Sequence, residues 1–249
     1  VVIWTRITPD EHAMPGSGGG ANTRVRWQVA RDAQLRDVIA EGETESLVER
    51  DHTIHVDVRG LEPDTVYYYA FTVANGPHEG AASPLGRTKT APVGHVDRQR
   101  WAVASCANWE SGFFAAYGDM AQRARGGEID HVVFLGDYIY EYPTGEYAGK
   151  SGVARMHHPE WEITTLEDYR QRHGRYRTDL NLQAAHAAFP WTVTWDDHEA
   201  QNNYADEFPE IGPASADFVR RRAAGPRARH GRRDVEPSGP PRVREELVP

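Results

Sequence analysis

The sequence predicts two folded parts, an N-terminal β-sandwich followed by an α/β domain, and three observations support this prediction. Residues 1–92 carry β-branched and aromatic residues in partial alternation, separated by turn-forming stretches such as residues 15–22. From Trp101 onward, apolar runs alternate with segments of helical periodicity, which is typical of an α/β sheet. Three of these apolar runs end in polar side chains, and sites in such sheets lie beyond the carboxyl ends of the strands.

The N-terminal part contains strand-like segments at residues 1–5, 23–30, 53–58 and 65–73. Residues 55–75 resemble a fibronectin type III or immunoglobulin-like sandwich, because a Leu-x-Pro turn precedes a tyrosine-bearing strand. We therefore expect the tyrosines of that strand to fill and flank a sandwich core. The domain is predicted to cover residues 1–92 and to be followed by a linker at residues 93–100.

In the second part, apolar runs begin at Trp101, His131 and Trp191, and each is typical of a buried strand. Helices are predicted from Phe113 to a glycine stop, and from Leu166 without interruption to the residue before Pro190. Because strand ends hold side chains rigidly, we expect metal or acid–base chemistry there. The residues at these ends are Ser105, Cys106 and Asn108, then Gly136, Asp137, Tyr138 and Tyr140, and finally Asp196, Asp197, His198 and Glu199.

Composition excludes some functions. The chain has 28 basic and 37 acidic residues, a formal net charge of −9, and this charge argues against nucleic-acid binding. A phosphate-bearing substrate would therefore need local positive charge from a metal or arginine. No apolar run of about 18 residues is present, so no transmembrane segment is predicted. Cys106 is the single cysteine, which leaves it as a core residue, a reactive thiol or a ligand.

Four segments, in the same order as in the family, resemble the PhoD-like alkaline phosphatases and phosphodiesterases: residues 1–6, 105–121, 134–142 and 165–203. GDYIYE together with WDDHE is the most specific part of this resemblance, which covers roughly residues 1–223. It implies a partial metallophosphoesterase α/β sandwich at residues 101–224. It also implies hydrolysis of phosphomonoesters or phosphodiesters, with a metal-bound hydroxide attacking phosphorus, in a periplasmic or extracellular protein.

The resemblance further implies an iron–calcium centre. Cys106 would supply a thiolate and Tyr140 a phenolate to Fe³⁺, and Asp137 would bridge both ions. Ca²⁺ would take oxygen ligands from Asp137, Asp197 and Asn203. His198, which we class as catalytic together with Asp137, would contact the phosphoryl oxygen or the leaving group.

Other interpretations remain open for several of these residues. A buried core thiol is the alternative for Cys106, a plain aromatic contact for Tyr140, and a turn for Asn203 with its neighbour. Asp196 and Glu199 are each equally compatible with ligation and with a supporting or capping role.

Three further features receive structural interpretations. His157 and His158 are expected to be solvated on a loop, and the arginines of residues 170–177 are expected to form a solvated or ion-paired helix face. His186 is expected to pack within its helix.

Residues 225–249 depart from the family pattern, because they are rich in Gly, Pro and Arg and lack an apolar period. We expect that a frameshift near Ala224 replaced the rest of the catalytic domain; a natural disordered tail is the alternative. The chain is then an incomplete copy that lacks the family's later metal ligands. Two other readings of its function follow: a catalytically incompetent fragment, and a β-sandwich binding module that needs no metal.

Overall fold

The computed structural model describes residues 1–8, 13–124 and 126–224. The predictions of a frameshift and of a disordered tail concern residues 225–249 and lie outside the described residues. Within the described ranges, no helix combines the length and the apolar character that a bilayer span requires.

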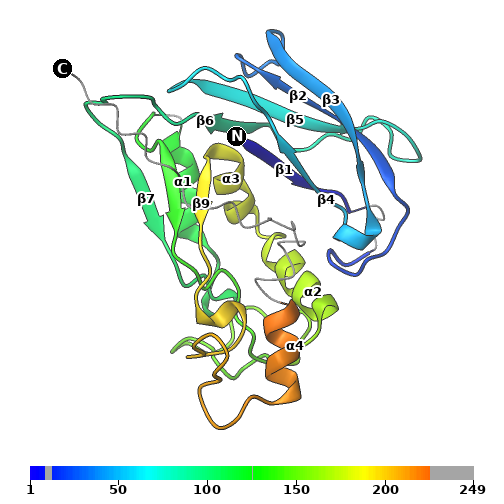
Figure 1. Cartoon of the computed structure of the whole chain (residues 1–249), viewed down its shortest axis with the longest axis vertical. Coiled ribbons are helices and arrows are strands. Elements are labelled where there is room, and N and C mark those ends of the chain that lie inside the picture. The colour runs from blue at the N-terminus through cyan, green and yellow to red at the C-terminus, as the bar shows by residue number, and fades with distance from the viewer. Residues whose placement is uncertain (9–12, 125, 225–249) are drawn as a thin grey trace, which may run out of the picture.

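Two antiparallel sheets form the N-terminal part (Figure 1). The smaller sheet pairs β1 with β4, and the larger has the strand order β3-β2-β5-β6. Apolar side chains from both sheets share one buried cluster, which includes Ile3, Val25, Ile54 and Phe71. The bounds of these strands are β1 Val2–Arg6, β2 Thr23–Ala30, β3 Val38–Ser46, β4 Thr53–Asp57, β5 Val66–Val73 and β6 Gly86–Lys89, with a short 3-10 helix η1 at Val48–Arg50.

Tyr67 on β5 is fully buried, as expected of a tyrosine that fills the core. Its hydroxyl accepts the backbone N–H of Glu62 at 3.0 Å, which is the kind of contact that a tyrosine corner makes. The assignment of these sheets to a fibronectin type III or immunoglobulin-like sandwich stays a prediction.

The second part is built on a parallel sheet in the order β7-β8-β9, so the mixed α/β class is confirmed. Ala102, Val132 and Trp191 point to one face of it, where they pack with residues of α1 and α3. Because all three strands run in one direction, their carboxyl ends meet at one edge of the sheet. The bounds are β7 Trp101–Ala104, β8 His131–Phe134, β9 Trp191–Val193, α1 Ala115–Ala124, α2 Leu166–Tyr176, α3 Leu180–Ala188 and α4 Ala216–Ala224, with 3-10 helices η2 Trp109–Ser111 and η3 Asp197–Glu199.

The uninterrupted helix predicted from Leu166 is wrong, because the chain forms α2 and α3 with a break between them. Asp179 causes the new start: its carboxylate accepts the backbone N–H groups of Asn181 and Leu182 at 2.9 and 3.0 Å. An aspartate in this position stabilises a helix N-terminus and competes with continuation of the preceding helix.

Edge strand β7 carries exposed apolar side chains. Trp101 and Val103 are 61% and 62% exposed, whereas Ala102 and Ala104, which alternate with them, pack against buried clusters. At the other edge, Val193 of β9 is 61% exposed. Apolar edge strands of this kind favour association with another surface.

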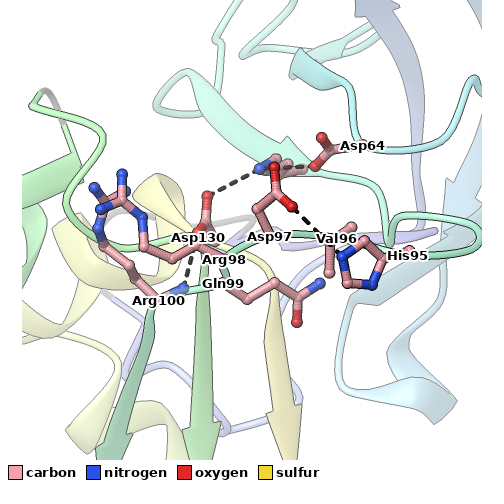
Figure 2. A pocket seen from close by; sticks show the side chains of 9 residues that line it. Asp64, His95, Val96, Asp97, Arg98, Gln99, Arg100 and Asp130 are labelled. Carbon is pink, nitrogen blue, oxygen red and sulfur yellow. Dashed lines mark hydrogen bonds and ion pairs between the residues drawn. The ribbon is translucent and has the colours of Figure 1, made fainter.

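Lys89 joins the two parts of the chain. Its ammonium lies 2.8 Å from Asp64 in the N-terminal part and 2.9 Å from Asp130 just before β8. The other carboxylate oxygen of Asp130 accepts the backbone N–H of Arg100, so the connecting segment is held at the same place. Figure 2 shows these charged residues lining an open pocket between the two parts.

Candidate metal centre

Asp137 lies in the turn after β8, at the edge of the parallel sheet where the carboxyl ends of the strands meet. Gly136 has φ +102°, and a Cβ at this position would lie 2.5 Å from the Cβ of Asp196. Glycine is therefore required both by the backbone conformation and by the close approach of the two strand ends. The backbone therefore turns sharply directly before Asp137.

Glu199 holds the two strand ends together. Its carboxylate accepts the backbone N–H groups of Asp137 at 3.0 Å and of Asp196 at 2.6 Å, and that of Tyr138 as well. Both carboxylate oxygens are used in this way, so Glu199 acts as a supporting residue that fixes the position of Asp137. The pKa of Glu199 lies above its ordinary value, because burial raises it by more than these three backbone hydrogen bonds lower it.

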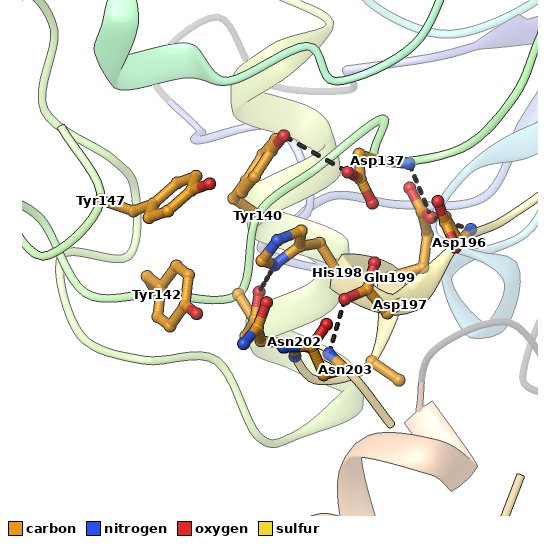
Figure 3. A network of polar contacts seen from close by, with 12 residues as sticks. Asp137, Tyr140, Tyr142, Tyr147, Asp196, Asp197, His198, Glu199, Asn202 and Asn203 are labelled. Atoms are coloured by element: carbon orange, nitrogen blue, oxygen red, sulfur yellow. Dashed lines mark hydrogen bonds and ion pairs between the residues drawn. The ribbon is translucent and has the colours of Figure 1, made fainter. Parts of the chain in front are cut away.

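The structure brings together Asp137, Asp197 and His198. One ligand atom from each lies within 4.8 Å of the other two, a spacing that can hold a metal ion. Figure 3 shows the two carboxylates beside the imidazole of His198. Asp137 Oδ1 is buried and has no hydrogen-bond partner among the described residues. A buried carboxylate oxygen without a partner carries a desolvation cost, which a bound cation would offset, so the residues present fit a metal.

Cys106 and Tyr140 flank the other oxygen of Asp137. The Cys106 thiol lies 3.5 Å and the Tyr140 hydroxyl 3.4 Å from Asp137 Oδ2. Cys106 is exposed, so its interpretation as a buried core thiol is wrong. The reason is its backbone: φ +57° turns the residue out of the direction of β7, and its N–H donates to Gly136 O at 3.1 Å.

Tyr140 is buried, and its ring centroid lies 4.4 Å from that of His198. The aromatic contact and the proximity to Asp137 therefore coexist. Burial raises the pKa of the Tyr140 phenol strongly, and the charge of Asp137 raises it further. Without a cation the phenol stays protonated, and ionisation requires positive charge close to its oxygen.

Glu141 is a site residue to which sequence reasoning assigned no role. His198 Nδ1 donates to Glu141 Oε2 at 2.8 Å, and Glu141 Oε1 accepts the backbone N–H of Asn202 at 2.7 Å. Burial alone would lower the pKa of His198, but Glu141 through its hydrogen bond and charge, with Asp137 and Asp197, raises it above its ordinary value. The only sequence signal for this role is the position of Glu141 directly after Tyr140.

Asn203 lies next to Asp197, but its contacts differ from those of a simple ligand. Its backbone N–H donates to Asp197 Oδ2 at 2.6 Å, and its side-chain nitrogen donates to Glu210 at 2.9 Å. The side-chain oxygen is not used in either bond. Asn202 and Asn203 form a turn, as the alternative interpretation proposed.

Arg172 corrects the prediction that the arginines of residues 170–177 form a solvated or ion-paired helix face. It is fully buried, and its guanidinium donates to the carbonyl oxygens of Tyr140, Tyr142, Pro159 and Trp161. Five donors in a fixed plane suit this role, which ties the segment after Asp137 to a later loop. Arg172 therefore holds in place the chain segment that carries Tyr140 and Tyr142.

His157 is also buried rather than solvated, which corrects its prediction. Its ring stacks on Tyr176 with centroids 6.1 Å apart, and burial, with the charges of Arg172 and Arg175, lowers its pKa to about 3. His186 packs as expected: it stacks on Trp191 at 3.9 Å and shares a hydrogen bond with the Tyr138 hydroxyl.

Comparison with known proteins identifies the class to which this fold and this group of side chains belong. Residues 101–233 match the family described as PhoD-like phosphatase, and residues 1–92 match the N-terminal domain of the same family. The chain therefore belongs to the PhoD-like phosphatase family, as its motifs predicted.

Two relatives are close in sequence. The chain is 48% identical over 229 residues to alkaline phosphatase D of Bacillus subtilis (strain 168), a match that covers 90% of this chain and 37% of that protein. A solved structure of PhoD superposes with a TM-score of 0.80 at 47% identity, covering 90% of this chain and 41% of that one. The chain thus spans well under half the length of either relative.

Proposed function

We propose that this chain carries part of the catalytic centre of a phosphoric ester hydrolase that acts on phosphomonoesters or phosphodiesters. The observation that carries the proposal is the cluster of Asp137, Asp197 and His198, with Cys106 and Tyr140 beside the same carboxylate. Family membership supports the reaction class. By the same resemblance, we place the protein in the periplasm or outside the cell.

The donor set favours two different metal ions. A thiolate from Cys106, a phenolate from Tyr140 and the carboxylate of Asp137 suit Fe³⁺. Oxygen donors from Asp137, Asp197 and the side-chain carbonyl of Asn203 suit Ca²⁺. When bound, these ions would neutralise charge on the phosphoryl oxygens and activate a water molecule for attack on phosphorus.

His198 and Glu141 handle the proton. Because Nδ1 donates to Glu141, Nε2 is the nitrogen that can face the substrate. Its proton would pass to the phosphoryl oxygen or to the departing alcohol. Glu141 keeps the imidazole in one orientation and stabilises its charged form, which makes it a positioning residue.

Substitution of Asp137 tests the proposal. Asp137→Asn removes the charge that would bridge the ions, so we expect the purified variant to lose its iron and its hydrolysis of a phosphate ester. Asp119→Asn is the matched control, because Asp119 is exposed on α1, where it pairs with Arg123 at 2.7 Å. Metal content and turnover are measured on the same samples.

Undiminished turnover in Asp137→Asn contradicts the assignment of Asp137. Wild-type protein that retains iron but hydrolyses no phosphate ester would favour the catalytically incompetent alternative. Wild-type protein that retains no iron would also favour the catalytically incompetent fragment, and the β-sandwich would then be the part to test for ligand binding.

A further inference from the structure

Three tyrosine rings lie beside His198 at the candidate site. Tyr140, Tyr142 and Tyr147 form this group, which we call the tyrosine wall (Figure 3). Tyr147 stacks on Tyr140 with centroids 5.5 Å apart and lies 5.3 Å from Tyr142. The imidazole of His198 lies 5.6 Å from the ring of Tyr147 and 5.5 Å from that of Tyr142. The wall therefore lies directly beside His198, the residue proposed to donate the proton.

The ring of Tyr147 is open to solvent as well as packed against its neighbours. It is 50% exposed, whereas Tyr140 is buried and Tyr142 is half-buried. An exposed aromatic ring that costs little side-chain entropy to fix is an effective contact surface for another ring. Tyr147 lies on a loop rather than in a core. Its packing against the other two rings therefore indicates a role in binding as well as in the fold.

The loop that carries Tyr147 is held firmly by the segment that follows Cys106. The Asn108 side chain donates to Tyr147 O at 2.9 Å. Two residues earlier, Gly145 N donates at 2.7 Å to the fully buried carboxylate of Glu110. Thr144 N donates to Glu160 O at 2.7 Å and closes the loop. These bonds fix the wall before any ligand arrives, which reduces the entropy that binding costs.

The surroundings of the wall are acidic. Glu141 directly precedes Tyr142, and the carboxylates of Glu141, Glu146 and Glu210 all lie close enough to the Tyr142 phenol to act on it electrostatically. A second anionic group on the substrate would be repelled by these carboxylates. A neutral ring meets no such penalty.

We propose that the tyrosine wall binds a neutral ring in the alcohol portion of the phosphate ester and so gives this chain a preference for ring-bearing over small aliphatic alcohols. This inference rests on the proposed phosphoesterase function. The phosphoryl group would lie at Asp137 and Asp197, and the ring would lie on Tyr147 beyond His198. Tyr147 is then the residue that determines specificity.

Calorimetric titration with phenylphosphonate and methylphosphonate tests the proposal, because neither compound is hydrolysed. We expect the metal-loaded wild type to bind phenylphosphonate more tightly, by about fivefold to tenfold for one aromatic contact. Tyr147→Ala should abolish this preference and leave the affinity for methylphosphonate unchanged, which shows that the site is intact. Tyr147→Phe keeps the ring and should keep the preference.

Equal affinity of the wild type for both phosphonates overturns the specificity role while the proposed function stands. The role is also overturned if Tyr147→Ala retains the preference, or if it weakens both ligands equally. If the wild type binds neither compound, the proposed phosphate site is wrong, and the inference fails with it.

Discussion

Asp137 and Glu141 differ in how far their roles can be predicted from the sequence. Asp137 is predictable from the sequence, because an apolar strand followed by Gly-Asp places a carboxylate at a strand end. Glu141 is not, because its partner His198 is 57 positions away and the contact exists only after β8 and β9 pair. The exposure of Cys106 and the burial of Arg172 and His157 are likewise tertiary effects that local pattern does not encode.

Glu141→Gln tests the role of Glu141. The amide keeps the size of the side chain but removes the charge that stabilises protonated His198, so we expect kcat/KM for a phosphate ester to fall by about tenfold or more. Steady-state kinetics check this, with iron content measured alongside. Glu167→Gln on the exposed side of α2 is the control and should leave kcat/KM unchanged. Equal kinetics for the two variants would remove Glu141 from the account.

His157 predicts an acid sensitivity. Its pKa is lowered to about 3 in the folded protein, whereas the unfolded chain takes up a proton near pH 6.5. Stability from this group is therefore present above about pH 6.5 and is lost as the pH falls toward 3, by about 2 kcal/mol between pH 7.5 and pH 5. Urea unfolding at pH 7.5 and pH 5 measures the loss. His157→Gln should lose less stability between these two pH values. The same loss in both proteins would contradict the attribution of the acid sensitivity to His157.

At the scale of elements, strongly periodic segments are predictable and breaks between them are not. β2, β5 and the strands of the parallel sheet follow from their apolar patterns. β3 does not, because its sequence VIAEGETES is polar, and it is held as an edge strand against β2, where Gly42 lies under the ring of Trp27. The break between α2 and α3 depends on Asp179, whose capping role competes with a sequence pattern that continues through it.

Asp179 carries the element-scale prediction. It caps α3 and also pairs with Arg155 Nη1 at 2.6 Å, with both side chains largely buried. Asp179→Ala removes both interactions and leaves the guanidinium without its carboxylate, so we expect a loss of about 2–4 kcal/mol in the free energy of unfolding. Asp179→Asn keeps an oxygen for the cap and should lose less. Chemical denaturation measures both variants, and a loss of under about 0.5 kcal/mol in Asp179→Ala would contradict this role.

At the scale of the whole molecule, the site draws on segments that lie far apart in the sequence. The turn after β7 supplies Cys106, the turn after β8 supplies Asp137 and Tyr140, and η3 after β9 supplies Asp197 and His198. The order β7-β8-β9 brings these ends to one edge of the sheet, with β8 in the centre. The fold class and the location of the site can be predicted from the sequence, because each apolar run ends in residues of the site. The exposure of apolar side chains on β7 and β9 cannot, because it is seen only once the strands are assembled into the sheet.

The visible absorption spectrum of the iron-loaded protein tests the central claim most directly. A phenolate bound to Fe³⁺ gives a purple absorption band, so we predict a purple wild-type protein whose phenolate band is lost in Tyr140→Phe, whereas any separate thiolate band from Cys106 remains. Tyr142→Phe, which changes the neighbouring ring of the wall, should keep the band. A wild-type protein that takes up iron without colour, or a purple phenolate band that survives unchanged in Tyr140→Phe, would contradict the assignment of Tyr140 to the metal centre.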